Sequence, residues 1–384
     1  MASSGGGPTQ IAVLANLGTA TTTVYDALAA RGHEVHLFTF HHAVLEGTQT
    51  REDVRRLHLR FLPAAVKWDP VALGRAVRRE LTRIQPEVWH AHIAIPYGVG
   101  AAATRWHPFL LTTHGSDVYF RAWIGKSARL RAPAVRAPAW LVFHSIHVAL
   151  SAVVDRLIVY SPDMMEVLPR LGYPRSKLVP CFLGIDTSLF RPGDGGSGDA
   201  SELRVICTRN LEPIYGHETL LEAASLLRGR GVRIRLVLAG DGSARPRLEG
   251  LAASLRLGDA VEFLGAVPHR DLPRWLVGSD VLVSPSHSDT TAMSVLEGMA
   301  CGLPVVVTEV GSLASRIVPG RHGFLFRPGD AEGLAGHLER IASDPALRHR
   351  MGEENRREVS SKYDLQGTVR SLEAAYEREA GGAR

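Results

Sequence analysis

The sequence predicts an α/β protein that consists of two doubly wound domains. The chain has 384 residues and is 45% hydrophobic, which is enough for two cores, since single cores seldom grow past roughly 250–300 residues. Short apolar runs rich in β-branched residues alternate with helical patterns in both halves, as expected of parallel sheets covered by helices. A run rich in Gly and Ser, residues 193–201, separates the halves and predicts a linker.

These observations predict the domain boundaries. Residues 1–10 lack the positive start and apolar core of a secretory signal, so we expect a short flexible tail there. We expect an N-terminal domain over residues 11–191, a linker over 192–202 and a second domain over 203–362. The remainder, residues 363–384, predicts a final helix with its clearest pattern from Tyr363 to Glu379.

The first half begins with a strand, a turn, a helix and a second strand. Residues 11–16 and 34–40 are the apolar strands, and Thr23–Arg31 is the helix between them. This order is a βαβ unit with parallel strands. The turn carries Gly18 but no Gly-x-Gly-x-x-Gly motif, which argues against a dinucleotide-dependent redox enzyme.

Histidines cluster around two strands of the first half. His114 and Asp117 follow the predicted strand Phe109–Thr112, at the end where open α/β sheets bind ligands. His90 and His92 should lie on one face of an earlier strand. No third ligand with suitable spacing accompanies them, so we predict no metal site. A single histidine is usually structural, and this chain has 17.

The segment Arg121–Arg136 alternates basic residues with small and apolar ones. It would suit either a lipid headgroup surface or a solvated lid, and we favour the lid because Pro133 and Pro138 should break an amphipathic helix. The apolar stretch Trp140–Val154 is shorter than the roughly 20 residues that span a membrane, so we expect a buried helix.

The second half repeats the alternation of strands and helices. Its strands are predicted at residues 203–208, 233–240, 260–267 and 280–285, and its helices at His217–Leu227, Arg245–Leu255 and Asp271–Val277. Arg209 follows the first of these strands directly. A guanidinium at a strand end offers a planar set of donors for two phosphate oxygens, although an isolated Arg is more often a surface residue.

The stretch Ser284–Gly311 combines a polar loop, a short helix and a strand. We expect the helix to start near Met293 and to end at Gly302, which can adopt a left-handed conformation. Asp289 lies in the loop and Glu297 in the first turns of the helix. Helix starts favour phosphate, and a carboxylate one turn inside suits ribose or sugar hydroxyls. From spacing alone, helix capping and dipole compensation explain the two acids equally well.

This stretch resembles the Glu-x7-Glu signature of retaining GT-B glycosyltransferases, the family-four enzymes also called group 1 glycosyltransferases. LEGMACGLPVVVTEVG follows the family pattern, as do the His114-Gly-Ser-Asp segment and the Gly-Ile-Asp-x-x-x-Phe segment at residues 184–190. The resemblance covers nearly the whole chain from Ile11. It implies two Rossmann-like domains that face each other across a cleft.

The resemblance also implies roles for individual residues. Asp289 would approach the donor sugar and Glu297 would hold the nucleotide ribose, while His114 would point at the transferred sugar, with Asp117 as a weaker supporting residue. The other donor-site residues by position are Gly18, Arg209, Ser294 and Val295.

Two residues depart from the family pattern. Asp289 stands in place of Glu and is one methylene shorter. Tyr215 stands before Gly216 where Lys is usual, which removes a positive charge from the diphosphate site. Three alternatives could replace that positive charge: Arg245, a cluster of backbone amides, or a group on the acceptor side.

We therefore expect a retaining glycosyltransferase that moves a sugar from a nucleotide-diphosphate donor to a hydroxyl acceptor, which would be a glycan, a lipid-linked glycan or a small molecule. The resemblance implies no metal and no other cofactor. Three alternatives stay open: a nucleotide-sugar 2-epimerase, a phosphorylase-like enzyme, and a non-catalytic nucleotide-sugar-binding or scaffold protein.

Composition adds expectations about location and partners. The three scattered cysteines, Cys181, Cys207 and Cys301, favour a reducing cytoplasm. The formal charge of +5 is modest and the Arg residues are spread along the chain, so nucleic acid is not an expected partner. Peripheral contact with the inner face of a membrane is left open.

Overall fold

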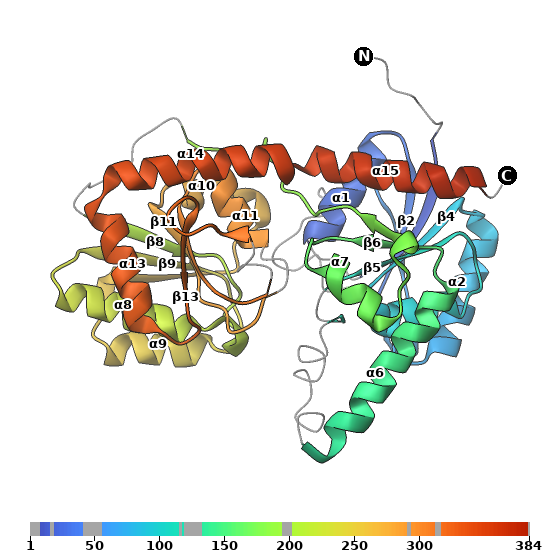
Figure 1. Ribbon diagram of the computed structural model, residues 1–384, viewed down its shortest axis with the longest axis horizontal. Helices are drawn as coiled ribbons and strands as arrows, with labels where there is room; N and C mark the ends of the chain where they lie inside the picture. The colour runs from blue at the N-terminus through green and yellow to red at the C-terminus, as the bar shows by residue number, and fades with distance from the viewer. Residues whose placement is uncertain are drawn as a thin grey trace. The chain divides into compact units, whose positions relative to one another are not determined.

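The computed structural model describes residues 8–15, 19–40, 56–114, 117–118, 133–193, 202–289, 293–311 and 316–382. They form two compact units, each with its own sheet (Figure 1). The first unit holds the described residues up to Leu183 together with those from Gln366 onward, and the second holds Gly184–Leu365. The sequence prediction instead placed the changes between domains within residues 192–202 and at Tyr363.

The first unit contains a parallel sheet of seven strands in the order β3-β2-β1-β4-β5-β6-β7. Its strands are β1 Gln10–Leu14, β2 Glu34–Thr39, β3 His58–Phe61, β4 Val88–His92, β5 Phe109–Thr113, β6 Arg156–Val159 and β7 Leu178–Pro180. Val13 in β1 pairs with Leu37 in β2 and with His90 in β4. The strand order therefore reverses between β1 and β4. All five residues of β4 are buried, as expected of a central parallel strand.

Helices and short turns cover this first sheet. They are α1 Thr19–Ala30, η3 Ala64–Val66, α2 Pro70–Ile84, η4 Ala94–Gly98, α3 Val99–Ala102, α6 Pro133–Val153, α7 Met164–Val167, η5 Leu168–Leu171, η6 Arg175–Lys177 and α15 Leu365–Gly382. At the start of α2, the Asp69 carboxylate accepts hydrogen bonds from the amides of Val71 and Ala72, both at 3.0 Å. Pro70 occupies the first helical position, where no amide hydrogen is needed.

Helix α6 differs from the sequence prediction in two ways. Pro133 and Pro138 do not break it, because Pro133 is its first residue and Pro138 removes only one hydrogen bond near its start. The helix was also expected to be buried. Phe143 and Leu150 are indeed in the core, but Leu141 and Val142 are 60% and 55% exposed. The exposed face carries apolar residues, so hydrophobicity alone could not separate it from the buried face.

The second unit contains a parallel sheet of six strands in the order β10-β9-β8-β11-β12-β13. Its strands are β8 Leu203–Cys207, β9 Ile234–Ala239, β10 Val261–Gly265, β11 Val281–Ser284, β12 Val305–Thr308 and β13 Gly323–Phe326. Its helices and short turns are η7 Pro213–Tyr215, α8 His217–Gly229, α9 Arg245–Ser254, η8 Gly258–Ala260, η9 His269–Asp271, α10 Leu272–Val277, α11 Met293–Ala300, α13 Ala331–Ser343 and α14 Pro345–Lys362. The doubly wound arrangement predicted for both halves is confirmed.

Helix α11 lies where the sequence predicted it and packs closely on the sheet. It begins at Met293 among the described residues, and Gly302 just beyond its end has a φ of +79°, which confirms the predicted left-handed stop. A Cβ at Gly298 would lie 2.7 Å from Leu282 Cδ1 in β11. This close approach fixes α11, and with it Ser294 and Glu297, against the carboxyl end of β11.

None of the helices among the described residues is both long enough and apolar enough to cross a membrane.

Candidate functional site

The loops after β8 and β11 meet at the carboxyl end of the second sheet. The two strands are neighbours, with Val205 paired to Val281. The chain continues from β8 to β9 on one side and from β11 to β12 on the other, so the strand order reverses here. Open α/β sheets bind ligands at such switch points.

Three other predicted site residues meet around the guanidinium of Arg209. Its Nη2 lies 3.0 Å from Asp289 Oδ2, and the two side chains are 15% and 5% exposed. Its Nη1 donates a hydrogen bond to Ser294 Oγ at 3.4 Å. Its Cζ lies 4.1 Å from the centre of the Tyr215 ring. The planar cation is therefore stacked on one side and held at its edge by an acid and a hydroxyl.

Tyr215 stands where the family pattern has a lysine. The ring supports Arg209 through a cation–π contact but adds no charge. Arg245, one of the proposed substitutes for the charge, lies 2.8 Å from Glu249 and 3.7 Å from Asp241. Because both neighbours are acids, the charge of Arg245 is compensated locally. Arg209 is also paired with an acid, Asp289, but it lies at the switch point of the sheet and is therefore the better placed cation for a diphosphate.

Backbone contacts set the spacing of this cluster. Gly216, which follows Tyr215, has a φ of +60°, and a Cβ at this position would overlap the carbonyl oxygen of Pro285 in the loop after β11. In the same place, the amide of His287 donates to the carbonyl of Ile214 at 2.9 Å. Glycine is therefore required at position 216, both for its left-handed conformation and for the close approach of the two loops.

Glu297 lies one turn into α11 and has a partner that the sequence did not predict. Its Oε1 lies 2.8 Å from His269 Nε2, and the two side chains are 8% and 23% exposed. His269 begins η9, which follows β10 at the same edge of the sheet. The sequence does place His269 just after a predicted strand, where site residues often lie. Its contact with Glu297, however, depends on how the two segments come together in the fold.

Two predicted donor-site residues remain, Val295 and Gly18. The Val295 side chain is 2% exposed and packs in the core, so only its backbone could contact a ligand. Gly18 lies outside the described residues.

In the first unit, Asp117 holds the loop that carries His114. One carboxylate oxygen accepts the amide of His114 at 2.7 Å, and the other accepts the amide of Ala94 at 2.6 Å. Asp117 is 1% exposed. It therefore ties the loop after β5 to the residues that follow β4, which supports a positioning role and not direct contact with an acceptor.

His90 and His92 lie on one face of β4, as predicted, with ring centres 4.7 Å apart. Among the described residues, no group of three or more His, Cys, Asp or Glu side chains could hold a metal ion. Burial lowers the pKa of His90 to about 3, and also lowers the pKa of His92 and His114. These histidines are therefore neutral at pH 7.

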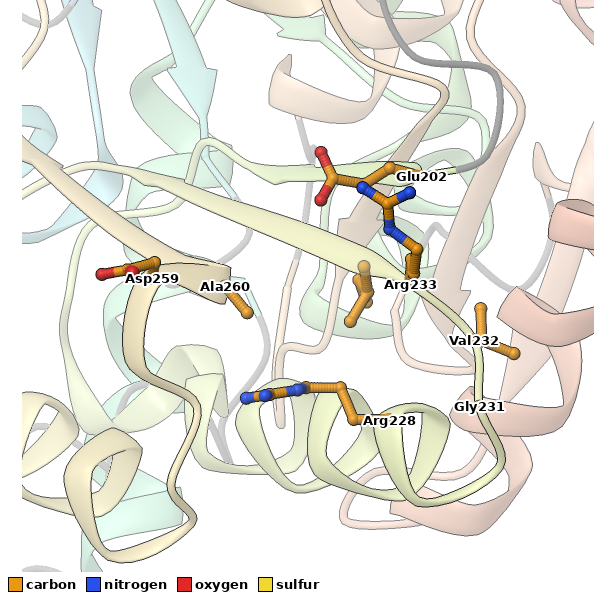
Figure 2. Close-up of a pocket in the computed structure, with 8 residues that line it drawn as sticks. Glu202, Arg228, Gly231, Val232, Arg233, Asp259 and Ala260 are labelled. Atoms are coloured by element: carbon orange, nitrogen blue, oxygen red, sulfur yellow. The ribbon is translucent and has the colours of Figure 1, made fainter.

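A surface pocket lies at the opposite edge of the second sheet, at the amino ends of β8 and β9 (Figure 2). Arg228 lines it from α8 and donates to the carbonyls of Arg256 and Leu257, each at 2.8 Å. None of the predicted site residues lines this pocket. Parallel α/β sheets bind ligands at the carboxyl ends of their strands, so the pocket is not the expected donor site.

Comparison with known proteins identifies two matching families. Residues 17–189 match the family described as Glycosyltransferase Family 4, and residues 199–358 match Glycosyl transferases group 1. Two similar proteins are both named D-inositol 3-phosphate glycosyltransferase. The one from Thermomonospora curvata is 29% identical over 84% of this chain and 81% of its own length. The one from Streptomyces avermitilis is 30% identical over 68% of this chain but only 59% of its own length.

Solved structures show the same fold. Sucrose-phosphate synthase from Thermosynechococcus elongatus has a TM-score of 0.81 at 22% identity, covering 98% of this chain and 100% of that chain. The Anabaena protein HepE, solved in complex with UDP-glucose, has a TM-score of 0.76 at 16% identity, covering 96% and 100%. The fold is GT-B, as the sequence predicted.

The buried neutral histidines predict that stability falls as the pH is lowered from 7 to 5. An unfolded histidine has a pKa of about 6.5, so below this pH the unfolded chain takes up protons that the folded chain does not. His90, with its pKa lowered to about 3, should alone remove roughly 2 kcal/mol of stability by pH 5. Urea unfolding at pH 7, 6 and 5 measures this. A midpoint that does not change over this range would show that these histidines are not buried and neutral.

Proposed function

Because the chain belongs to the group 1 glycosyltransferases of the GT-B type, we propose that it moves a sugar from a nucleotide-diphosphate donor to a hydroxyl acceptor with retention at the anomeric carbon. The observation that carries this proposal is the fixed guanidinium of Arg209 at the switch point of the second sheet. A nearly buried cation at this edge is suited to a diphosphate.

The donor diphosphate would bind Arg209 and the start of α11. The phosphate oxygens compete with Asp289 for the guanidinium, so donor binding loosens the pair that holds these two side chains 3.0 Å apart. The backbone amides of Ser294 and Val295 add donors at the start of the helix. Asp289 is then available to a sugar hydroxyl, which is the role its position implies.

The ribose would bind Glu297. His269 holds one carboxylate oxygen of Glu297, which fixes the orientation of the group. A buried carboxylate with a fixed orientation is a suitable acceptor for two adjacent hydroxyls. We therefore add His269 to the donor site as the residue that positions Glu297.

The proposed reaction is a front-face displacement. The bond between the anomeric carbon and the leaving phosphate oxygen breaks, and the acceptor oxygen bonds to the same face of that carbon. The leaving phosphate takes the proton from the acceptor hydroxyl, so no protein base is needed. Asp289 orients the sugar and supports its oxocarbenium-like charge, while Arg209 stabilises the charge that develops on the diphosphate.

We propose that the reaction needs no divalent cation. Arg209 and the start of α11 would supply the positive field that a metal ion supplies to diphosphates elsewhere. The complex of HepE with UDP-glucose makes UDP and its sugars the first donors to test. The names of the curated relatives make a phosphorylated inositol one acceptor to include beside glycans and lipid-linked acceptors.

The second candidate function is nucleotide-sugar binding without transfer. Two observations favour it: Tyr215 brings no charge, and Asp289 neutralises Arg209. A binding protein would give a ligand-dependent rise in stability with no turnover. A 2-epimerase would convert the donor with no acceptor present, and a phosphorylase would require inorganic phosphate.

Contact with a membrane surface is a separate proposal that rests on α6. Its exposed apolar side chains are Trp140, Leu141, Val142, Val148 and Val153. The sequence from residue 118 to 154 contains no Asp or Glu and five basic residues. An exposed apolar helix face in a sequence rich in basic residues is typical of contact with anionic lipids.

Removal of Arg209 should abolish stabilisation by a nucleoside diphosphate. A ligand at about 100 times its dissociation constant adds roughly 2.7 kcal/mol of stability, which gives a clear thermal shift. The wild-type protein is heated with UDP, GDP, ADP or dTDP, each in EDTA and then in magnesium. We expect a shift with one of them in EDTA that is lost in Arg209→Ala.

Three further variants test the geometry around Arg209. Arg245→Ala should keep the shift, because the charge of Arg245 is balanced by two acids. Tyr215→Phe should also keep it, whereas Tyr215→Ala should reduce it because the stacked ring is lost. If no diphosphate shifts the wild-type protein, both the donor site and the proposed function are wrong.

Removal of the His269 contact should weaken nucleotide binding without abolishing it. His269→Gln leaves Glu297 present but less fixed, so we expect roughly a tenfold loss of affinity, as for the loss of one hydrogen bond to a charged group. Glu297→Ala should lose more. Calorimetric titration with the diphosphate measures both, with exposed His349→Gln as the control. An unchanged affinity in His269→Gln would remove His269 from the site.

Vesicle binding tests the membrane proposal. We expect the protein to sediment with vesicles of phosphatidylcholine and phosphatidylglycerol, and to be released by salt because anionic lipids contribute. The double variant Trp140→Ser with Leu141→Ser should bind less, whereas Val71→Ser, at an exposed apolar residue of α2, should bind as the wild type does. Wild-type protein that stays in the supernatant at low salt would contradict the proposal.

A further inference from the structure

A continuous line of buried polar groups runs through the first unit to His114. It includes Tyr25 of α1, His90 and His92 of β4, and Tyr376 of α15, which are all 0–1% exposed. Figure 1 shows α1 and α15 near one another at the first sheet. A buried polar group is costly unless it is hydrogen-bonded. The arrangement is therefore specific and is not ordinary core packing.

Hydrogen bonds connect the members in order. His114 Nε2 lies 2.8 Å from His92 Nδ1, and His92 Nε2 lies 2.6 Å from the Tyr25 hydroxyl. The Tyr25 hydroxyl lies 3.2 Å from that of Tyr376, which in turn lies 2.7 Å from His90 Nδ1. His90 Nδ1 also lies 2.9 Å from the Tyr25 hydroxyl itself, so Tyr25, Tyr376 and His90 form a triangle. His90 Nε2 lies 2.7 Å from Thr112 Oγ1.

The protonation states of the members restrict how the chain can be arranged. Burial lowers the pKa of the three histidines and raises the pKa of Tyr25 and Tyr376. Each imidazole is therefore neutral at pH 7 and carries one ring proton, and each phenol keeps its proton.

His92 uses both of its ring nitrogens in the chain. If Nε2 accepts the proton of Tyr25, then Nδ1 must carry the ring proton and donate to His114. If Nε2 instead donates to Tyr25, then His114 must donate to His92. The tautomer of His114 therefore depends on whether the Tyr25 hydroxyl donates to His92 or accepts from it, although Tyr25 lies two hydrogen bonds away from His114.

The distances favour one direction. The contact between Tyr25 and His92 is the shortest in the chain at 2.6 Å, which is usual for an O–H donor and short for an N–H donor. With Tyr25 as donor to His92, the Tyr25 oxygen can accept from Tyr376 at 3.2 Å or from His90 Nδ1 at 2.9 Å. His90 can also donate to Tyr376, and Thr112 can donate to His90 Nε2. Every proton is then used once, and bonds that point the same way strengthen one another.

We propose that this chain donates head to tail into Nε2 of His114 and holds His114 in the tautomer that carries its proton on Nδ1. Tyr25, His92 and Tyr376 are then positioning residues. The inference rests on the proposed function for its role at the sugar: His114 would meet the substrate as a hydrogen-bond donor and would not take the acceptor proton. The proton then passes to the leaving phosphate.

The proposal also gives the C-terminal helix a part in the site. The described residues from Gln366 onward belong to the first unit, and Glu373 in the same helix pairs with Arg31 at 2.6 Å. That ion pair anchors α15 beside α1, where Tyr376 reaches Tyr25. If α15 only anchored the C-terminus to the first unit, loss of the Tyr376 hydroxyl alone would have no effect on the site.

The test is nitrogen-15 NMR of the full-length protein labelled at histidine. Long-range proton–nitrogen spectra distinguish protonated from bare ring nitrogens, and spectra of His114→Asn and His92→Asn assign the signals. We expect both His92 and His114 to carry their protons on Nδ1 in the wild-type protein at pH 7. A wild-type His114 protonated on Nε2 would overturn the proposal without the need for any variant.

Variants of the two tyrosines test the dependence. Tyr25→Phe should change the His114 signals toward a mixture of tautomers and lower kcat by roughly tenfold with a smaller effect on KM. Tyr376→Phe should have the same effects to a lesser extent, because His90 Nδ1 lies 2.9 Å from the Tyr25 hydroxyl and can donate to it directly. The matched control is Tyr173→Phe, because the Tyr173 ring is also buried in the first unit and its hydroxyl bonds His147 at 3.1 Å, outside the chain. This control should change neither the signals nor the rate.

The outcomes separate this inference from the proposed function. An unchanged His114 tautomer in Tyr25→Phe would refute the chain whether or not the protein is active. A changed tautomer in a protein that transfers no sugar would keep the chain but refute its role in transfer. A changed tautomer with an unchanged rate would show that the chain serves the fold and not the reaction.

Discussion

The ion pair between Arg209 and Asp289 is the interaction on which the candidate site depends. It joins the two loops at the switch point of the second sheet, where the side chains are 15% and 5% exposed. Removal of either partner would leave a nearly buried charge uncompensated. A donor diphosphate is a natural replacement partner for the cation, so the same pair that stabilises the unliganded site is the one that a substrate must rearrange.

The two units place their functional groups by the same rule. In each sheet the strand order reverses between two central strands, and polar residues follow the carboxyl ends of strands there or next to them. The second unit presents a stacked cation beside a helix start. The first presents a neutral histidine supported by a buried chain of hydrogen bonds. One arrangement suits a diphosphate and the other suits an uncharged sugar.

Much of the fold could be predicted from local sequence. Apolar runs and glycines predicted both sheets, the position of α11 and its stop at Gly302, because these features depend on short-range pattern. The stack of Tyr215 on Arg209 could not be predicted, because it depends on how the loop after β8 folds back on itself. The contact of His269 with Glu297 could not be predicted either, because it joins segments that follow different strands, β10 and β11. Helix α6 was expected to be buried because hydrophobicity does not reveal which face of a helix lacks a partner.

The most direct test of the account is proton NMR of the anomeric centre during turnover. The protein is incubated in EDTA with α-linked nucleotide-sugars, UDP-glucose first, with and without hydroxyl acceptors. The account predicts a product with an α-glycosidic bond that forms only when an acceptor is present, and a diphosphate released in equal amount. A β-linked product, donor conversion without acceptor, or no turnover with any donor and acceptor would contradict it.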